Sequence, residues 1–436
     1  MEHASDRFDA HVGGPFPSLL LAAAALTLSV CAFGVDVAAH GRPLLSWFDL
    51  NIYDHVGVLA RHDPGAVYEW RARGRGFTYT PFAALLFAAF SELPRSLTHW
   101  LMLVASLGAL GATVWLTLGE LDSWRPRRVP AALALTACLL WTEPVLKALK
   151  LGQVELLLMA LVVYDLRRPD SRRWKGTALG LAAAIKLTPL IFVAYLALVG
   201  SRRAAGMAAA VFAATAAVGA VLLPKASDVW WLHGRMFHAG FVTGVGSRVN
   251  QSLLGLLSRA AGSVGAATPA WLALAAVVGV VGLGTAVALN RSGLSVAGWS
   301  TCALTGLLIS PISWDHHWVW IVPILLCLID AAVRLAGRAR RLALVATGVV
   351  AALFGGWPRS LSGPDAFVPG NGLLGSPPSP NMLPAKPGWL HALDVIGSNL
   401  FVGTGIVLLV LAGVAAVRLR AVRLAPVPAY AARSSG

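Results

Sequence analysis

Charged residues are scarce in this sequence. They make up 13% of the 436 residues, and hydrophobic residues make up 57%, whereas soluble globular domains carry about 25% charged residues. Many apolar runs approach the roughly 20 residues that a helix needs to cross a bilayer. These Leu, Ala and Val runs lack the alternation of membrane β-strands, which argues against a β-barrel. The sequence therefore predicts an all-α polytopic membrane protein.

Acidic residues are scarcer still, at 20 against 35 Lys and Arg, which gives a formal charge of +15. A nucleic-acid partner is not expected, since membrane proteins gather Lys and Arg in cytoplasmic loops as an orientation signal. Six basic clusters fit that rule when all are placed inside the cell: Arg125, Arg127 and Arg128; Arg167, Arg168, Arg172, Arg173 and Lys175; Arg202 and Arg203; Arg291; Arg334, Arg338, Arg340 and Arg341; and Arg418, Arg420 and Arg423.

Motifs for metals, disulfides and nucleotides are missing. The four cysteines lie in apolar segments without a CxxC pair, which favours buried thiols over disulfides. There is no GxxxxGK[ST] phosphate loop, HExxH zinc pair or GxSxG nucleophile elbow. We therefore expect no cofactor and no metal site, and an activated donor carried by a lipid.

The apolar runs predict about twelve crossings in one membrane domain, residues 1–436, with both ends inside. Residues 17–37 form the first span, 82–90 an interfacial helix, and 174–200 a pair of short helices broken at Lys186-Leu187-Thr188-Pro189. Other spans are expected at 97–118, 130–146, 151–166, 205–223, 270–290, 296–310, 316–333, 341–356 and 395–417. Residues 357–394, rich in Pro and Gly, are expected to form an outer loop.

The outer loop at 38–80 is the predicted catalytic segment. It has no core to fill, yet it carries Asp49, Asp54 and Glu69 among aromatic and arginine residues. Asp49 is predicted to be the catalytic base, against the alternative of a helix cap. Asp54 follows at i+5 and on a helix would point elsewhere, which favours a supporting role.

Lysines on the outer side oppose the orientation bias, so we expect them to bind an anionic ligand such as a lipid phosphate. The predicted donor-phosphate ligands are Lys186, Lys150, Lys147, His316 and His317, although the adjacent histidines are not expected to reach one ligand together. The predicted substrate-binding residues are Asp54, Tyr53, Gln153, Glu155, Asn250, Gln251 and Asp315. Helix capping is the alternative for Asp315 and the Asn250-Gln251 pair, and snorkelling to headgroups for Lys147 and Lys150.

Six segments carry a family resemblance: FDLNIYDH, FTYTPFAALLF, LGQVELLLMALVVYDLRR, GLAAAIKLTPLIFVAYL, NQSLLGLLSR and LLISPISWDHHWVWIVP. In this order they resemble the actinobacterial polyprenyl-phosphate-mannose-dependent α-1,2-mannosyltransferases of the GT-C superfamily, from about residue 45 to 330. Relatives often have two prolines where this chain has Thr80-Pro81, and an Asn at Glu155. These departures bear on loop geometry and sugar specificity.

The resemblance implies a multi-span enzyme of the plasma membrane with its active site facing the periplasm and Asp49 as general base. It implies transfer of mannose from polyprenyl-phosphate-mannose to the 2-hydroxyl of a mannose on phosphatidylinositol mannoside, lipomannan or lipoarabinomannan. An arabinofuranosyltransferase using decaprenyl-phosphoryl-arabinose is the nearest alternative. A lipid-sugar flippase is the alternative from another class, though the inverted repeats typical of transporters are not evident.

Overall fold

Helices account for nearly all the regular structure in this computed structural model, which describes residues 15–40, 45–72, 75–237, 244–356 and 395–424. The first half contains α2 (Pro15–His40), α3 (Phe48–His62), η1 (Pro64–Tyr68), α4 (Pro81–Phe90), α5 (Arg95–Leu118), η2 (Asp122–Arg127), α6 (Arg128–Leu139), α7 (Glu143–Leu151), α8 (Glu155–Leu166), α9 (Thr177–Ile185), α10 (Leu190–Val199) and α11 (Arg202–Leu222). Two short antiparallel strands, β1 (Arg71–Ala72) and β2 (Arg75–Gly76), form a hairpin between η1 and α4.

The second half continues with short turns and then long helices. It contains α12 (Pro224–Ser227), η3 (Asp228–Leu232), η4 (Arg235–Phe237), α13 (Leu253–Ala261), α14 (Val264–Arg291), α15 (Ser295–Ile309), η6 (Asp315–Trp320), α16 (Ile321–Arg334), α17 (Gly337–Leu353) and α20 (Leu400–Leu424). The predicted outer loop at 357–394 lies outside the described residues.

Six segments within the described ranges are long and apolar enough to cross a membrane: Ser18–Val35, Arg95–Leu118, Arg202–Leu222, Val264–Arg291, Asp315–Arg334 and Leu400–Arg420. Shorter apolar helices occur at Pro81–Phe90, Leu190–Val199 and Ser295–Ile309. The protein is thus an all-α, membrane-embedded polytopic protein. The larger number of about twelve crossings stays a prediction.

One expected span was wrong, and the predicted outer loop contains a helix. The span at 130–146 is two helices, because α6 ends at Leu139 and the backbone N–H of Glu143 bonds to the carbonyl oxygen of Phe354 at 2.7 Å. The loop at 38–80 contains the 15-residue helix α3, whose buried Leu50, Tyr53, Gly57 and Ala60 recur at helical spacing. That apolar stripe explains why the segment packs as a helix.

The broken helix pair at 174–200 is confirmed. Lys186 has extended backbone angles (φ −138°, ψ 134°) between α9 and α10. Pro189 has helical angles and precedes α10. The break places Lys186, whose side chain is 14% exposed, at the centre of an otherwise apolar segment.

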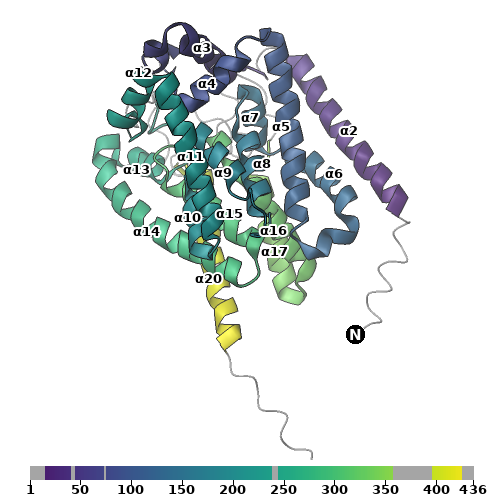
Figure 1. Ribbon diagram of the computed structural model, residues 1–436. Coiled ribbons are helices and arrows are strands. Elements are labelled where there is room, and N and C mark those ends of the chain that lie inside the picture. The colour runs from purple at the N-terminus through teal and green to yellow at the C-terminus, as the bar shows by residue number, and fades with distance from the viewer. Residues whose placement is uncertain (1–14, 41–44, 73–74, 238–243, 357–394, 425–436) are drawn as a thin grey trace, which may run out of the picture.

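One continuous hydrophobic cluster forms the main core and extends from Phe33 in α2 to Leu409 in α20. Around it α2 packs on α6, α5 on α8, α9 on α11, and α14 on α15. In Figure 1, α3, α4 and α12 lie at one end of the bundle, at the top of the view, and α20 extends from the opposite end. Figure 1 also shows that α2 runs along one side of the bundle towards α3.

Contacts between loops join the first five of the six basic clusters. Arg167 lies 3.3 Å from Glu120, and Ser123 bonds to Asp330 beside Arg334. Two further guanidinium contacts complete the chain, from Arg203 to the Arg172 carbonyl at 2.7 Å and from Arg291 to the Leu198 carbonyl at 3.3 Å. These five clusters therefore lie on one side of the molecule.

A close helix contact fixes α3 against α4 and gives a stability prediction. A Cβ atom at Gly57 would overlap the carbonyl oxygen of Phe87, so Gly57→Ala should destabilise the protein by about 1–3 kcal/mol, the usual cost of overpacking. Gly108→Ala in α5 is the matched control, because nothing lies within 4 Å of its Cβ position and Ala favours a helix by up to about 1 kcal/mol. Thermal unfolding in detergent should therefore move in opposite directions for the two variants; equal shifts would contradict the packing argument.

Candidate active site

The entry to α3 places Asp49 beside the turn between α7 and α8. Trp47 has left-handed backbone angles (φ 51°), rare for a bulky residue. Its N–H bonds to the carbonyl oxygen of Lys150 at 3.0 Å, and its ring stacks on His99 with centroids 4.7 Å apart. Asp49 then lies in the first turn of α3. The carboxylate is thus held within a helix of the predicted outer segment and near residues a hundred positions later.

A buried amide holds the Asp49 carboxylate. Gln153 Nε2 donates to Asp49 Oδ2 at 2.5 Å, while Gln153 Oε1 lies 2.5 Å from the Tyr53 hydroxyl and 2.9 Å from the Tyr79 hydroxyl. The two hydroxyls are 2.6 Å apart. Burial raises the pKa of both phenols well above the ordinary value, with the nearby Glu155 and Asp49 carboxylates adding to the rise. Both therefore stay protonated and keep the amide turned so that its N–H points to Asp49.

Sequence reasoning missed Tyr79. It precedes Thr80, whose side chain caps α4 by accepting the Ala83 N–H at 3.2 Å, with Pro81 at the first helical position. Thr80 also bonds to the carbonyl oxygen of Ala184 at the end of α9. The FTYTPF segment could have pointed to Tyr79, because Thr80 and Pro81 mark the start of a helix and so set the position of the tyrosine just before it.

A second polar group gathers at the broken helix pair. Lys186 Nζ pairs with Glu155 Oε1 from α8 and lies 2.9 Å from His317 Nε2 of η6. His317 Nε2 is 3.4 Å from Glu155 Oε1. The ammonium also lies 5.2 Å from the ring centroid of Tyr79. Tyr79 thus joins the Lys186 group to the network around Asp49.

Lys147 and Asp315 form a buried ion pair next to this group, with side chains 13% and 1% exposed. Asp315 Oδ1 accepts the backbone N–H of His316 at 2.9 Å and lies 3.4 Å from His316 Nδ1. Asp315 is the first residue of η6, whose N-cap is Trp314, so its carboxylate holds the first turn without occupying the cap position. The pair ties α7 to the turn that carries both histidines.

Lys150 lies half-buried at the end of α7, close to the entry of α3. Burial lowers its pKa to about 8, and the positive charge of Lys147 adds to the fall. A lysine with this pKa changes its charge near physiological pH.

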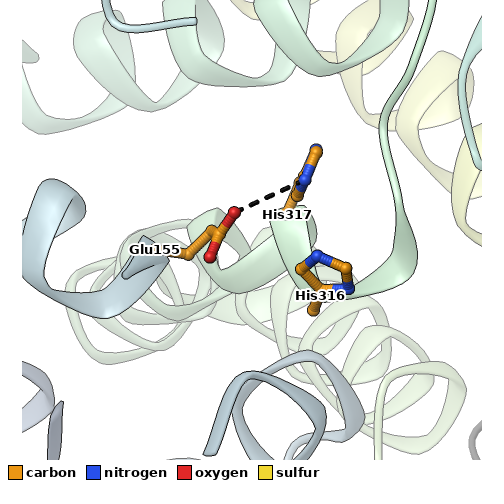
Figure 2. A group of neighbouring side chains, drawn as sticks. All are labelled: Glu155, His316 and His317. Atoms are coloured by element: carbon orange, nitrogen blue, oxygen red, sulfur yellow. Dashed lines mark ion pairs between the residues drawn. The ribbon is translucent and has the colours of Figure 1, made fainter. Parts of the chain in front are cut away.

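Both histidines lie in one cluster with Glu155. The expectation that the adjacent histidines do not reach one ligand together stays a prediction. Figure 2 shows Glu155, His316 and His317 grouped around a common space. Their ligating atoms all lie within 4.8 Å of one another. The rings are nearly perpendicular, with centroids 4.7 Å apart. A 3₁₀ turn and a third group from α8 make this possible.

Three predicted substrate ligands lie elsewhere. The buried Asn250 amide donates to the Val245 carbonyl and accepts the Ser313 N–H. The buried Gln251 amide donates to the Ser398 carbonyl. Asp54 faces Arg95 at 3.5 Å. These contacts give the two amides a structural role and turn Asp54 towards α5, so substrate binding by the three residues stays a prediction.

Comparison with known proteins gives a consistent family match. The family model described as Glycosyltransferase family 87 matches residues 77–311. A Mycobacterium tuberculosis (strain CDC 1551 / Oshkosh) polyprenol-phosphate-mannose-dependent alpha-(1-2)-phosphatidylinositol pentamannoside mannosyltransferase is 33% identical over 66% of this chain and 68% of its own.

Two further relatives agree with this match. A polyprenol-phosphate-mannose-dependent alpha-(1-2)-phosphatidylinositol mannoside mannosyltransferase from M. tuberculosis (strain ATCC 25618 / H37Rv) is 31% identical over 67% of this chain and 70% of its own. A pentamannoside mannosyltransferase from Mycolicibacterium smegmatis is 32% identical over 65% and 70%. No solved structure matches. Since the family model covers over half of the sequence and includes Tyr79, Gln153, Glu155 and Lys186, this chain belongs to glycosyltransferase family 87.

Proposed function

We propose that this protein is an α-1,2-mannosyltransferase that moves mannose from polyprenyl-phosphate-mannose to the 2-hydroxyl of a mannose on a cell-envelope glycolipid. The observation that carries the proposal is Asp49, held by the buried Gln153 amide and joined through Tyr79 to the cationic Lys186 group. The relatives named above use a polyprenol-phosphate-mannose donor and a phosphatidylinositol mannoside acceptor. A phosphatidylinositol mannoside is therefore the first acceptor to test.

The reaction is a direct displacement. Asp49 takes the proton of the acceptor 2-hydroxyl as that oxygen attacks the anomeric carbon of the donor mannose. The bond between that carbon and the phosphate oxygen breaks, and polyprenyl phosphate leaves with the bonding electrons. Displacement on a β-mannosyl phosphate gives an α-mannoside. A positioned general base contributes roughly 100- to 10,000-fold.

Cations stabilise the leaving phosphate. Lys186 and Lys150 are the proposed ligands, because an ammonium beside a developing phosphate charge lowers the barrier. Glu155, Lys186 and His317 line one part of a cavity whose other walls include Met159, Phe192 and Trp320. A polar end and apolar walls fit a lipid-linked phosphate. The leaving group is a lipid monophosphate, and the proposed steps use only side chains of the protein: Asp49 as base and the lysines as phosphate ligands.

The proposed location is the plasma membrane, with the site facing the periplasm. The linked basic clusters support this orientation, because such residues favour the cytoplasmic side. Asp49 lies in α3, at the end of the bundle away from the C-terminal end of α20, which carries Arg418 and Arg420.

Reconstituted vesicles test the proposal. Purified protein is given a phosphatidylinositol mannoside with either polyprenyl-phosphate-mannose or decaprenyl-phosphoryl-arabinose, and the product linkage is read by mass spectrometry and NMR. An added α-1,2-mannose is expected from the mannose donor alone. Transfer of arabinose would favour the alternative enzyme, and donor movement across the bilayer without a new glycosidic bond would favour a flippase. Glycolipids that accumulate in cells lacking the protein would identify the acceptor.

The low pKa of Lys150 predicts an alkaline limit to activity. The side chain is charged below about pH 8 and loses its proton as the pH rises through that value, so kcat/KM for the donor should fall above about pH 8. Lys150→Arg should move this fall to higher pH, because a guanidinium keeps its charge. The exposed Lys225→Arg is the control and should leave the profile unchanged. A fall at the same pH in Lys150→Arg would assign it to another group.

A further inference from the structure

The cluster of Glu155, His316 and His317 has features that the proposed transfer reaction does not use. Glu155 comes from α8 and both histidines from η6 (Figure 2). One oxygen or nitrogen from each side chain lies within 4.8 Å of the others. The Glu155 and His316 side chains are 6% and 7% exposed, and that of His317 is 11% exposed. Three ligating atoms thus converge in a place with little water.

Several of these atoms are buried without a hydrogen bond. Among the residues that the structure describes, none bonds to Glu155 Oε2 or to His316 Nε2. His316 Nδ1 faces Asp315 Oδ1 at 3.4 Å, which leaves Nε2 as the ring nitrogen available to a ligand. A buried polar atom left without a partner costs about 1–3 kcal/mol. Such atoms in a native fold need an explanation, and a bound ion is one that fits a group of three converging side chains.

Two imidazoles and one carboxylate are the ligands of open zinc sites, where a fourth position takes water or substrate. We propose that Glu155, His316 and His317 form a binding site for a divalent transition metal, with Zn²⁺ as the best fit. Zinc ligands at about 2.0–2.2 Å from the ion lie roughly 3.3–3.6 Å from one another, so small side-chain rotations suffice. This inference goes beyond the proposed reaction and runs counter to our sequence expectation of no metal.

Lys186 competes with the metal for the lone pairs of Glu155 and His317. Its ammonium pairs with Glu155 Oε1 and lies 2.9 Å from His317 Nε2. The side chain is 14% exposed, lines the cavity and starts from extended backbone. It can therefore swing into the cavity when a doubly charged ion takes the carboxylate. Metal binding would then turn the ammonium towards the space that we assign to the donor phosphate.

Cobalt titration of the full-length protein tests the site. Detergent-purified protein is stripped with a chelator and titrated with Co²⁺, whose visible absorption reports tetrahedral nitrogen and oxygen ligation, and Zn²⁺ is then used to displace it. We expect one metal ion per chain. Glu155→Gln and His316→Asn should weaken binding by more than about 100-fold, since even supporting groups contribute 10- to 100-fold. His62→Asn, an exposed histidine at the end of α3, is the matched control and should bind normally.

Lys186→Met gives a test in the opposite direction. Without the competing ammonium it should bind Co²⁺ at least about tenfold more tightly, a result that misfolding cannot imitate. Absence of a saturable site, or equal binding by wild type, Glu155→Gln and His62→Asn, would overturn the proposal. Mannose transfer is measured on the same wild-type sample. Transfer without cobalt binding would remove the metal site alone, whereas cobalt binding without transfer would remove the proposed function alone.

Discussion

Asp49→Asn is expected to lower mannose transfer by roughly 100- to 10,000-fold, the contribution of a positioned general base. Asparagine keeps the size of the side chain and an oxygen that can accept the Gln153 N–H bond. The α3 helix and the tyrosine pair should therefore stay in place. What is lost is the capacity to take a proton from the acceptor hydroxyl, so kcat should fall while donor binding persists.

The neighbouring Asp63→Asn is the matched control. Asp63 is an exposed carboxylate just past the end of the same helix, and its variant should transfer mannose at the wild-type rate. Initial rates in reconstituted vesicles, with donor binding measured separately, check both results. Turnover of Asp49→Asn within a few-fold of wild type would remove Asp49 from the role of base.

Lys147→Met should destabilise the protein by about 3–5 kcal/mol. The variant leaves the Asp315 carboxylate, 1% exposed, without the cation that faces it. An uncompensated buried charge is among the most costly defects in a folded protein. Unfolding in mixed detergent micelles measures the change. The result would also show how much of the role of Lys147 is structural, since its phosphate contact stays a prediction.

Adding Asp315→Asn to Lys147→Met removes the stranded charge and should restore much of the lost stability. A surface pair serves as the control: Arg125 and Asp122 lie 2.8 Å apart with side chains 70% and 84% exposed. Arg125→Met should cost no more than about 1 kcal/mol. A Lys147→Met variant as stable as Arg125→Met would show that water reaches Asp315.

The sequence predicted those structural features that depend on neighbouring residues. The break near Lys186 was predicted from Pro189, because a proline disfavours helical geometry in the residue before it. The structure confirms the break. The α3 helix inside the predicted outer loop was not foreseen, since its polar and aromatic residues hid the stripe of Leu50, Tyr53, Gly57 and Ala60. A count of apolar positions at helical spacing would have found it.

The site itself depends on contacts that no local pattern encodes. Gln153 meets Asp49 across 104 positions, and Lys147 meets Asp315 across 168. Sequence reasoning selected these residues as candidates but treated them as separate ligands for substrate or phosphate. Their partners within the protein depend on how the helices pack, as the position of Tyr79 over Lys186 illustrates.

The short helices α9 and α10 affect how the chain inserts into the membrane during synthesis. With nine and ten residues, neither is long enough to span a bilayer alone, so the translocon receives them with the charge of Lys186 between them. A lysine at the centre of a membrane helix opposes insertion by about 2.5–3.5 kcal/mol. Glu155 leaves the ribosome first and can meet this lysine as it enters, whereas His317 is made later. Neutralising the carboxylate should therefore impair biogenesis at α9, before the histidines exist.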